Sequence, residues 1–378
     1  THLLMKVNKK IKILFSISNL ISSGSGREMI NIIDGLDKDK FSVLVQIRKS
    51  GSDKEKELKE KGVEIITELQ AASSVKGVFN SFKRAVTLGL NYRKYKIDIW
   101  QSFDWSSDWT EALTAKVSGA AYIYVKKNMN WDRKAWKLKS LLSSKVVLRN
   151  SDLKKSHFDN ILFRGKGFFI TGGVDTDKFK PINNVNNIYR QKFGIHNNSC
   201  LIICVAQISS VKGQHLIIEA LKDMENAYLI IAGKIINPDY YQKVLSLIKK
   251  YDLEEKVIIP GFVEDIKQLH SESDIYILPT TFAYGHEEGC PVSLLEALSC
   301  GSCCIASDVA GSRDLISDGY DGYLFEPESV LDLKRKIELV KKASTEEIKK
   351  NARNNILKYH TLKHEQDEFQ KLYLNLTN

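Results

Sequence analysis

The chain has 378 residues, 43% of them hydrophobic and 27% charged, with a formal net charge of +10. This composition is sufficient for sizeable buried cores, and the length is sufficient for two domains. No run of ~18 or more apolar residues is present, which argues against a membrane span. Tandem repeats of solenoid length and low-complexity tracts are also absent from the sequence.

In the first half of the chain, short apolar runs that predict strands alternate with helical patterns such as 27–36 and 54–61. The first run follows several lysines and superficially resembles a signal peptide. Because Ser16, Ser18 and Asn19 interrupt it and no small-residue cleavage site follows cleanly, we interpret it as a buried strand. The predicted strands of this half are 11–18, 41–47, 63–66, 97–101, 121–126 and 145–149.

A glycine-rich stretch, S-S-G-S-G at 22–26, separates the first predicted strand from the first predicted helix. It lacks the spacing G-x-G-x-x-G, so we reject a dinucleotide-binding site there. Further along, G-G-V-D-T-D-K-F-K-P at 172–181 and the polar run at 183–187 form the best domain boundary, near residue 180. The D-T-D in this linker matches a metal-binding string, but its position indicates coincidence, and we expect no metal site.

The second half repeats the alternation, with strands predicted at 200–206, 227–232, 256–259, 275–278 and 303–306. Its predicted helices include 213–221, 240–251, 292–298 and 330–343. Such alternation predicts parallel sheets covered by helices on both faces, hence two doubly wound α/β domains. Ligands of such sheets bind beyond the carboxyl ends of the strands, so we expect the site in a cleft between the domains.

All six cysteines lie in this half, and two of them form a C-x-x-C at 300–303. No second pair and no histidine cluster stands nearby, so we interpret the cysteines as small buried hydrophobic residues rather than zinc or redox ligands. Reduced thiols in this number are typical of a cytoplasmic protein. The six are Cys200, Cys204, Cys290, Cys300, Cys303 and Cys304.

Two carboxylates, Glu288 and Glu296, bracket a Gly-Cys-Pro corner and the start of the predicted helix 292–298. The free amides of a first helical turn, with the positive end of the helix dipole, form a site for a phosphate or diphosphate. Glu288 would then accept hydrogen bonds from hydroxyls ahead of that anion, and Glu296 from hydroxyls behind it. A nucleotide-sugar presents its groups in this order, although a buried strand followed by an ordinary amphipathic helix is the alternative.

This segment resembles the donor-site signature E-G-x-P-x-x-x-x-E-A of the retaining GT-B glycosyltransferases of family 4. The resemblance also covers the linker at 172–181, Lys212-Gly213, the turn 261–263 and D-G-Y-D-G-Y-L-F at 318–325. It implies a GT-B fold of two Rossmann-like domains facing across a cleft. The expected parts are an acceptor-binding domain at 1–180, a nucleotide-sugar-binding domain at 181–355, and a last helix at 356–378 that packs back on the first domain.

The resemblance also implies the roles of individual residues in donor binding. The base would pack on 261–263, the ribose hydroxyls would bind Glu296, and the diphosphate would bind Lys212 and the amides around 293–295. Glu288, in register with the family's first glutamate, would hold the sugar hydroxyls, and Glu288 and Lys212 would be catalytic. The expected donor-binding residues are Gly24, Gly26, Gln207, Lys212, Gly213, Gly261, Phe262, Val263, Glu288, Gly289, Cys290, Pro291, Val292, Ser293, Leu294, Leu295 and Glu296.

The chain departs from the family pattern at two positions. Gln207 stands where the family usually has an arginine on the diphosphate, so either catalysis would be slower or a neighbouring base, Arg313 or Lys234, would substitute for it. Lys126 or Lys127 stands where many members have a histidine near the donor sugar. We assign Lys126, Lys127 and Asp104 to the acceptor site, with solvated lysines at a strand end as the alternative.

Positive charge is concentrated in residues 1–180, with 34 Lys+Arg against 19 Asp+Glu. A basic surface that also carries apolar side chains is typical of proteins that bind anionic membranes, although a merely solvated lysine-rich surface is an equal alternative. No nucleic-acid-binding motif is recognisable. The apolar residues among these bases are Phe79, Phe82, Leu88, Leu90, Tyr92, Trp131 and Trp136.

The resemblance thus implies a retaining glycosyltransferase that requires no metal and no cofactor. Its partners would be a nucleoside-diphosphate sugar, a glycan, lipid-linked or protein acceptor, and an anionic membrane surface, but not nucleic acid. We expect it in the cytoplasm, at the inner face of the membrane, in the synthesis of cell-surface polysaccharide or glycoconjugates. The alternative is an inactive GT-B homologue acting as a binding or scaffold subunit; an epimerase would need carboxylates and histidines that we do not find.

Overall fold

The computed structural model describes residues 9–20, 24–67, 77–127, 129, 131, 133–182, 185–282 and 289–377. These residues divide into two compact units. The first holds the described residues up to Ile170 and from Lys363 onward, and the second holds Thr171–Leu362. The chain thus passes into the second unit ten residues before the boundary expected from the sequence, and returns to the first unit after Leu362.

The first unit contains a parallel sheet that has, among the described residues, seven strands in the order β3-β2-β1-β4-β5-β6-β7. Long runs of apolar, β-branched residues form its central strands, as expected of strands that are buried on both faces. The strands are β1 (Ile11–Asn19), β2 (Phe41–Lys49), β3 (Glu64–Ile66), β4 (Ile99–Ser102), β5 (Ala121–Lys126), β6 (Lys145–Leu148) and β7 (Gly167–Phe169).

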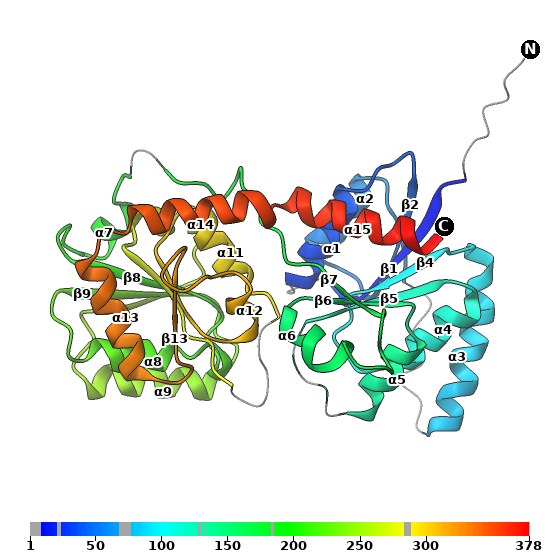
Figure 1. Cartoon of the computed structure of the whole chain (residues 1–378), viewed down its shortest axis with the longest axis horizontal. Coiled ribbons are helices and arrows are strands. Elements are labelled where there is room, and N and C mark those ends of the chain that lie inside the picture. The colour runs from blue at the N-terminus through cyan, green and yellow to red at the C-terminus, as the bar shows by residue number, and fades with distance from the viewer. Residues whose placement is uncertain are drawn as a thin grey trace, which may run out of the picture. The chain divides into compact units, whose positions relative to one another are not determined.

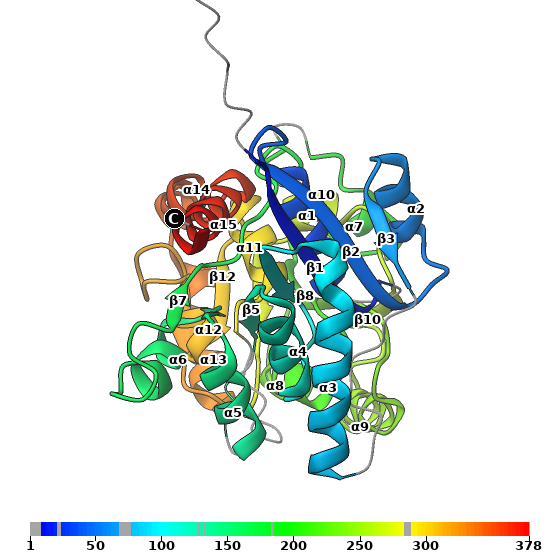
Figure 2. The same cartoon turned by 90° about the vertical axis from the view of Figure 1, so that its right-hand side faces the viewer.

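Helices cover both faces of this sheet, because successive side chains of each strand point to opposite sides. Ile13 and Phe15 of β1 pack in one core with residues of α1 and α15, while Leu14 packs in another with residues of α4 and α5. Figures 1 and 2 show α1, α2 and α15 on one face and α3, α4 and α5 on the other. The bounds are α1 (Gly24–Asp34), α2 (Asp53–Glu60), α3 (Val78–Tyr92), α4 (Thr110–Ser118), α5 (Lys134–Leu142), α6 (Ser151–Leu153) and α15 (Leu362–Thr377).

The second unit contains a parallel sheet with six strands in its described part, in the order β10-β9-β8-β11-β12-β13. Its strands are also apolar on both sides, which again indicates burial between two layers of helices. The strands are β8 (Cys200–Val205), β9 (Ala227–Ala232), β10 (Val257–Gly261), β11 (Ile275–Leu278), β12 (Cys304–Ser307) and β13 (Tyr323–Phe325).

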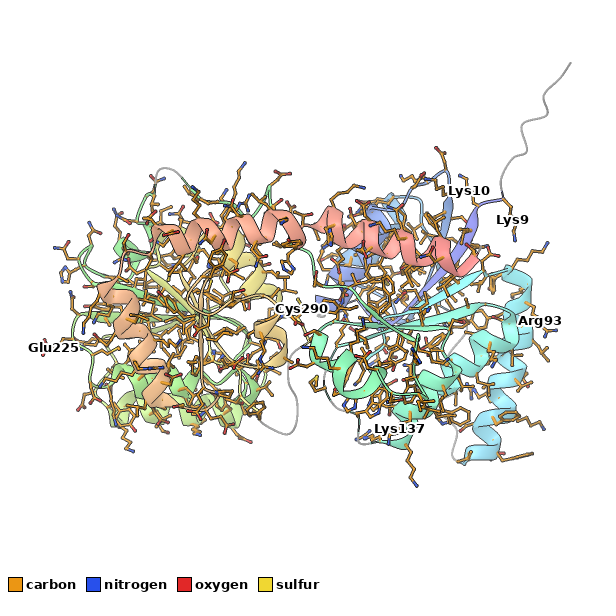
Figure 3. The ribbon with its side chains drawn as sticks, viewed as in Figure 1. Lys9, Lys10, Arg93, Lys137, Glu225 and Cys290 are labelled. Atoms are coloured by element: carbon orange, nitrogen blue, oxygen red, sulfur yellow. The ribbon has the colours of Figure 1, made fainter. Side chains whose placement is uncertain are left out.

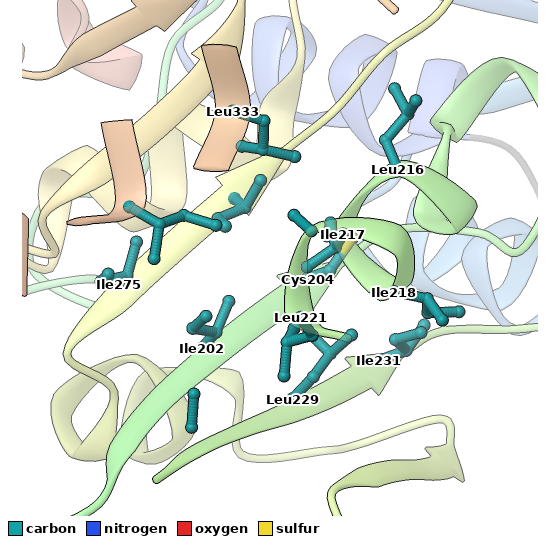
Figure 4. Close-up of a cluster of buried hydrophobic side chains, with 14 of the residues drawn as sticks. Ile202, Cys204, Leu216, Ile217, Ile218, Leu221, Leu229, Ile231, Ile275 and Leu333 are labelled. Carbon is teal, nitrogen blue, oxygen red and sulfur yellow. The ribbon is translucent and has the colours of Figure 1, made fainter. Parts of the chain in front are cut away.

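Two cores cover the two faces of this second sheet. Ile202 and Cys204 of β8 pack with α8, α9 and α13, as Figure 4 shows for several of these side chains. Leu201 and Ile203 point the other way and pack with α11 and α14. The helices are α7 (Ile188–Lys192), α8 (Gln214–Leu221), α9 (Pro238–Lys250), α10 (Ile266–Glu272), α11 (Val292–Ser299), α12 (Ala310–Arg313), α13 (Val330–Lys342) and α14 (Glu346–Tyr359).

The prediction of two doubly wound α/β units is confirmed by these sheets. In each sheet the strand order reverses once, between β1 and β4 in the first and between β8 and β11 in the second. Such a reversal opens a crevice at the carboxyl ends of the two strands, which is where ligands of doubly wound sheets bind. The fold therefore gives each unit one preferred place for a ligand.

Candidate functional site

In the second unit, α11 starts beside the point where the strand order reverses. Its N-cap is Pro291, which has no side-chain acceptor, and the amides of Leu294 and Leu295 bond to the Pro291 carbonyl at 3.1 and 3.2 Å. The amides of Val292 and Ser293 have no hydrogen-bond acceptor among the described residues. The apolar residues of α11 anchor it in the core, while Val292, Ser293 and Glu296 share its less buried side.

The other helices of seven or more residues that follow a strand of this sheet differ from α11 in one respect. A side-chain oxygen accepts a hydrogen bond from a first-turn amide in each of them. The acceptors are Tyr240 for α8, Asn237 for α9, Asp265 for α10 and Ser329 for α13. Since an uncapped N-terminus carries free donors and a partial positive charge, α11 is the helix suited to an anion.

Lys212 and Gly213 lie on the other side of the same crevice, between β8 and α8. Lys212 ends a short 3-10 helix (Ser210–Lys212), and Gly213 has φ +61°. A Cβ atom at Gly213 would lie 1.9 Å from the carbonyl oxygen of Pro279, so no other residue fits there. Glycine therefore allows the lysine loop to pack directly against the chain that leaves β11.

Two hydrogen bonds join these neighbouring segments. The Thr281 amide donates to the Val211 carbonyl at 2.8 Å, and the Thr281 hydroxyl donates to the Ser210 carbonyl at 2.9 Å. The Lys212 loop and the segment that precedes Gly289 are consequently held at one edge of the sheet. An ammonium group and a free helix N-terminus at one edge form a suitable environment for a diphosphate.

Glu296 lies one turn into α11 and is half-buried. Burial raises the pKa of its carboxyl group to about 7, although Lys178 acts in the opposite direction. Such a carboxyl group, which has no hydrogen-bond partner among the described residues, is suited to accept hydrogen bonds from ligand hydroxyls. Glu288, the other glutamate predicted to bind the ligand, lies outside the described residues, as do His286 and Glu287.

Gln207, Lys234 and Phe262 lie side by side, at the ends of β8, β9 and β10. Gln207 is exposed, and the next residue, Ile208, bonds through its amide to the Lys234 carbonyl at 2.9 Å. The Lys234 ammonium lies 5.6 Å from the ring centre of Phe262, which is 68% exposed. Gly261 has φ +80°, and Val263 is buried in the core, so Val263 can meet a ligand only through its backbone.

The two substitutes considered for the charge missing at Gln207 differ in their surroundings. Arg313 is held by Asp308, with its Nε 2.7 Å from the carboxylate and one further nitrogen 2.9 Å from the Asp308 carbonyl. Lys234 lies beside Gln207 and forms no ion pair within the described part of the chain. Of the two, Lys234 is therefore better placed to supply charge there.

In the first unit, Gly24 and Gly26 belong to the first turn of α1, so this helix begins three residues earlier than predicted and the glycines are not in a loop. The Lys127 ammonium bonds to Ser25 Oγ at 2.7 Å and to Glu28 at 2.5 Å. Arg149 also pairs with Glu28. These bonds from the ends of β5 and β6 stabilise the first turns of α1, which explains the earlier start.

Arg149 extends this network to the C-terminal helix. Its guanidinium pairs with Glu365 of α15 at 2.6 Å and donates to the Ile170 carbonyl at 3.0 Å. Burial disfavours the charge on Glu28, but Arg149 and Lys127 outweigh it and hold the Glu28 pKa at about 2. Sequence reasoning missed Glu28, Arg149 and Glu365, because no local motif links residues more than a hundred positions apart.

The three residues assigned to the acceptor all have partners inside the first unit. Lys127 belongs to the network just described, and the Lys126 ammonium is fully buried, 3.8 Å from the ring centre of Trp136. Burial, with a smaller effect of Lys139, lowers the Lys126 pKa to about 7. Asp104 is buried, accepts a hydrogen bond from Ser18 at 2.6 Å and pairs with Arg48 at 3.3 Å.

The described residues contain no group of three or more His, Cys, Asp or Glu side chains that could hold a metal ion. All six cysteines are free thiols, and Cys204, Cys300, Cys303 and Cys304 are buried. Asp175 of the D-T-D string accepts hydrogen bonds from the amides of Asp177 and Lys178, as a turn residue does. No helix in the described residues is both long and apolar enough to cross a bilayer.

Comparison with known proteins finds a family model that matches part of the second unit. Residues 185–357 match the model of the glycosyl transferases group 1. An α-1,3-galactosyltransferase of Escherichia coli, named for UDP-Gal and α-D-GlcNAc-diphosphoundecaprenol, is 25% identical over 219 residues, 55% of this chain and 54% of that protein. The chain thus matches about half the length of this curated relative.

Solved structures agree over nearly the whole chain. A glycosyltransferase from Rickettsia africae has a TM-score of 0.84 at 22% identity, covering 97% of this chain and 98% of the other. The Anabaena protein HepE, solved with UDP, has a TM-score of 0.80 at 18% identity and covers 96% and 100%. Residues 185–357 thus match the glycosyl transferases group 1 model, and the chain has the GT-B fold of these solved structures.

Proposed function

We propose that the protein is a retaining, metal-independent glycosyltransferase that uses a nucleoside-diphosphate sugar as donor. The observation that carries the proposal is the uncapped start of α11 at the strand-order reversal, opposite the Lys212 loop. The names of the galactosyltransferase and of HepE with UDP support a donor of this kind. The diphosphate would bind the amides of Val292 and Ser293 together with Lys212, and the ribose hydroxyls would bind Glu296.

The remaining donor contacts follow from this placement. Phe262, exposed at the end of β10, would cover the base, and Glu288 would accept hydrogen bonds from the sugar hydroxyls. The neighbouring Lys234 would offset the lack of charge at Gln207. Lys234 and Phe262 lie near the place assigned to the diphosphate, because β8, β9, β10 and β11 all end at the same edge of the sheet.

In the proposed reaction, the bond between the sugar's anomeric carbon and the diphosphate oxygen breaks. A new bond forms on the same face between that carbon and the acceptor oxygen, and the acceptor proton passes to the departing diphosphate. Lys212 and the α11 amides would stabilise the charge that develops on the diphosphate, which is the largest expected contribution to the rate. Neither glutamate has to act as a nucleophile in this scheme.

The acceptor would be a hydroxyl of a lipid-linked glycan, by analogy with the diphosphoundecaprenol acceptor named for the Escherichia coli relative. The enzyme would thus act at a membrane, in the synthesis of cell-surface polysaccharide. Because Asp104, Lys126 and Lys127 have partners inside the first unit, they would act mainly by shaping the acceptor site.

A donor screen tests the proposal. Purified protein is mixed with UDP-, GDP-, ADP- and TDP-sugars, and thermal stabilisation and nucleotide release are measured for wild type and Glu288→Ala. We expect one donor to stabilise the protein and to be turned over slowly, and Glu288→Ala to abolish release. Binding without release, even with membrane extract as acceptor, would instead indicate an inactive subunit, and no binding of any nucleotide would refute the donor site.

A further inference from the structure

The face of the first unit covered by α3, α4 and α5 exposes apolar side chains among basic ones. Phe79 is 79% exposed, and Phe82 and Leu90 of the same helix are each 49% exposed. Leu138 and Leu141 of α5 are also exposed. Three aromatic residues that the sequence grouped with them, Tyr92, Trp131 and Trp136, are instead buried in the core.

Phe79, Phe82 and Leu90 lie on one side of α3 with the half-buried Val86, because these four residues are spaced three or four positions apart. The opposite side packs on α4, where a Cβ atom at Gly89 would lie 2.7 Å from the Thr114 carbonyl oxygen. The helix is thus fixed by one side and presents an apolar stripe on the other. Exposed aromatic residues in such a stripe indicate a binding surface rather than ordinary solvent contact.

The exposed bases of this face have no acidic partners in the described part of the chain. Lys83, Arg84 and Lys137 form no ion pair, and Figure 3 shows Arg93 and Lys137 projecting away from the unit. Both α3 and α5 lack acidic residues altogether. Arg84 is half-buried, and the exposed bases of the two helices and the residues flanking them are Lys83, Arg93, Lys94, Arg133, Lys134 and Lys137.

Bases on the opposite face of the same sheet are paired. Lys61 bonds to Asp34 at 2.8 Å and to Glu57 at 2.9 Å, and Arg27 bonds to Glu57 at 3.0 Å. Among the described residues, Arg27 and Lys61 of the α1–α2 face are thus paired with acids, whereas the bases of the α3–α5 face are not. A surplus of charge on one face only indicates an anionic partner for that face.

We propose that the α3–α5 face docks on an anionic lipid bilayer, with Phe79 and Phe82 inserted among the headgroups. A bilayer fits this face better than a protein does, because unpaired lysines and arginines around aromatic side chains match a phosphate-rich surface above an apolar layer. The surface is made by the first unit alone and shares no residue with the proposed donor site. Tests of the two can therefore fail independently.

Vesicle flotation tests this docking with the full chain. Vesicles of phosphatidylcholine with 30% phosphatidylglycerol are compared with pure phosphatidylcholine, at low and high salt. We expect binding to the anionic vesicles only, weakened by salt, and lost by about tenfold or more in Phe79→Ser/Phe82→Ser. Lys83→Gln/Arg84→Gln should weaken binding by on the order of fivefold for each charge removed.

Matched controls separate this face from general charge and hydrophobicity. Lys38→Gln/Lys56→Gln removes two exposed charges elsewhere in the first unit, and Leu331→Ser removes an apolar side chain that is 81% exposed in the second unit. Neither should change vesicle binding, and thermal unfolding of every variant should match wild type. Absence of binding to anionic vesicles, or equal losses in the controls, would overturn the proposal.

Fluorescence quenching is a second measurement, which tests directly whether residue 79 inserts into the bilayer. Tryptophan introduced as Phe79→Trp should gain fluorescence quenching by brominated lipids relative to wild type, whereas Leu331→Trp should not. If Phe79→Ser/Phe82→Ser instead converts a dimer to a monomer in light scattering and no variant binds vesicles, the face is a contact between copies of the chain. That outcome would also refute membrane docking.

Discussion

The two units share one architecture, but they differ in whether the polar groups near the reversal of strand order have partners. In the first unit, Ser18 donates to Asp104 across the ends of β1 and β4, and Lys127 and Arg149 both pair with Glu28 at the start of α1. In the second unit, the first amides of α11 have no acceptor among the described residues. The first unit thus uses its polar groups there for stability, whereas the second leaves donors available to an anion.

This comparison predicts opposite consequences for substitutions in the two places, beginning with the buried ion network. Arg149→Met takes the guanidinium away from the buried Glu365 and leaves Glu28 with Lys127, so the free energy of unfolding in urea should fall by about 3–5 kcal/mol. The exposed pair of Arg313 and Asp308 serves as the control, since Arg313→Met should cost less than about 1 kcal/mol. Equal losses in both variants would contradict the stabilising role of the network.

The lysine loop should tolerate no side chain at Gly213. Gly213→Ala combines a left-handed backbone with a Cβ atom 1.9 Å from the Pro279 carbonyl oxygen, and should lower the free energy of unfolding by roughly 2–4 kcal/mol. Gly319 has φ +76° but open space around it, so Gly319→Ala should cost only about 1 kcal/mol. A similar cost for both variants would show that the close contact is unimportant.

Lys212 should matter for binding and not for folding. Removing a charged donor to a phosphate costs about 1.5–3 kcal/mol, so Lys212→Ala should weaken nucleoside diphosphate binding by roughly 10- to 150-fold in calorimetric titrations. Its free energy of unfolding should change by less than about 1 kcal/mol. Lys222→Ala, at the exposed far end of α8, is the matched control and should leave affinity unchanged.

The raised pKa of Glu296 predicts how stability changes with pH. The native carboxyl group holds its proton up to about pH 7, whereas the unfolded chain releases it near pH 4.5, so the free energy of unfolding falls as pH rises through this window. Glu296→Gln removes that fall and should therefore gain up to about 2 kcal/mol relative to wild type between pH 4 and pH 8. Unfolding curves at several pH values, with the exposed Glu254→Gln as control, measure this difference.

Much of the fold was predictable because it depends on local patterns. Apolar runs such as 121–126 and 227–232 became β5 and β9 without any change of bounds. The three-residue strands β7 and β13 were missed, since Gly167–Phe169 and Tyr323–Phe325 are too short to show a period. The boundary between the two units, at Ile170, depends on long-range packing and cannot be read from a linker motif.

The candidate site was predictable where its chemistry lies within one segment. Pro291 cannot cap a helix with its side chain, and Gly213 lacks a side chain altogether, so the sequence itself indicates an uncapped α11 and a tight lysine loop. The partners of Lys127 were not predictable, because Ser25 and Glu28 lie far from it in the sequence. A strand-end lysine in sequence therefore does not reveal whether it is available to a ligand.

The most direct test of the account is a negative charge placed in the first turn of α11. Val292 is 54% exposed there, so Val292→Asp should raise the free energy of unfolding by about 0.5 kcal/mol through the helix dipole. The same carboxylate should weaken binding of UDP, GDP or ADP, whichever binds wild type, by tenfold or more, while Val292→Asn and the matching phosphate-free nucleoside serve as controls. Greater stability with lost diphosphate affinity is the predicted result, and unchanged diphosphate affinity in Val292→Asp would contradict the central claim that this helix start binds the donor.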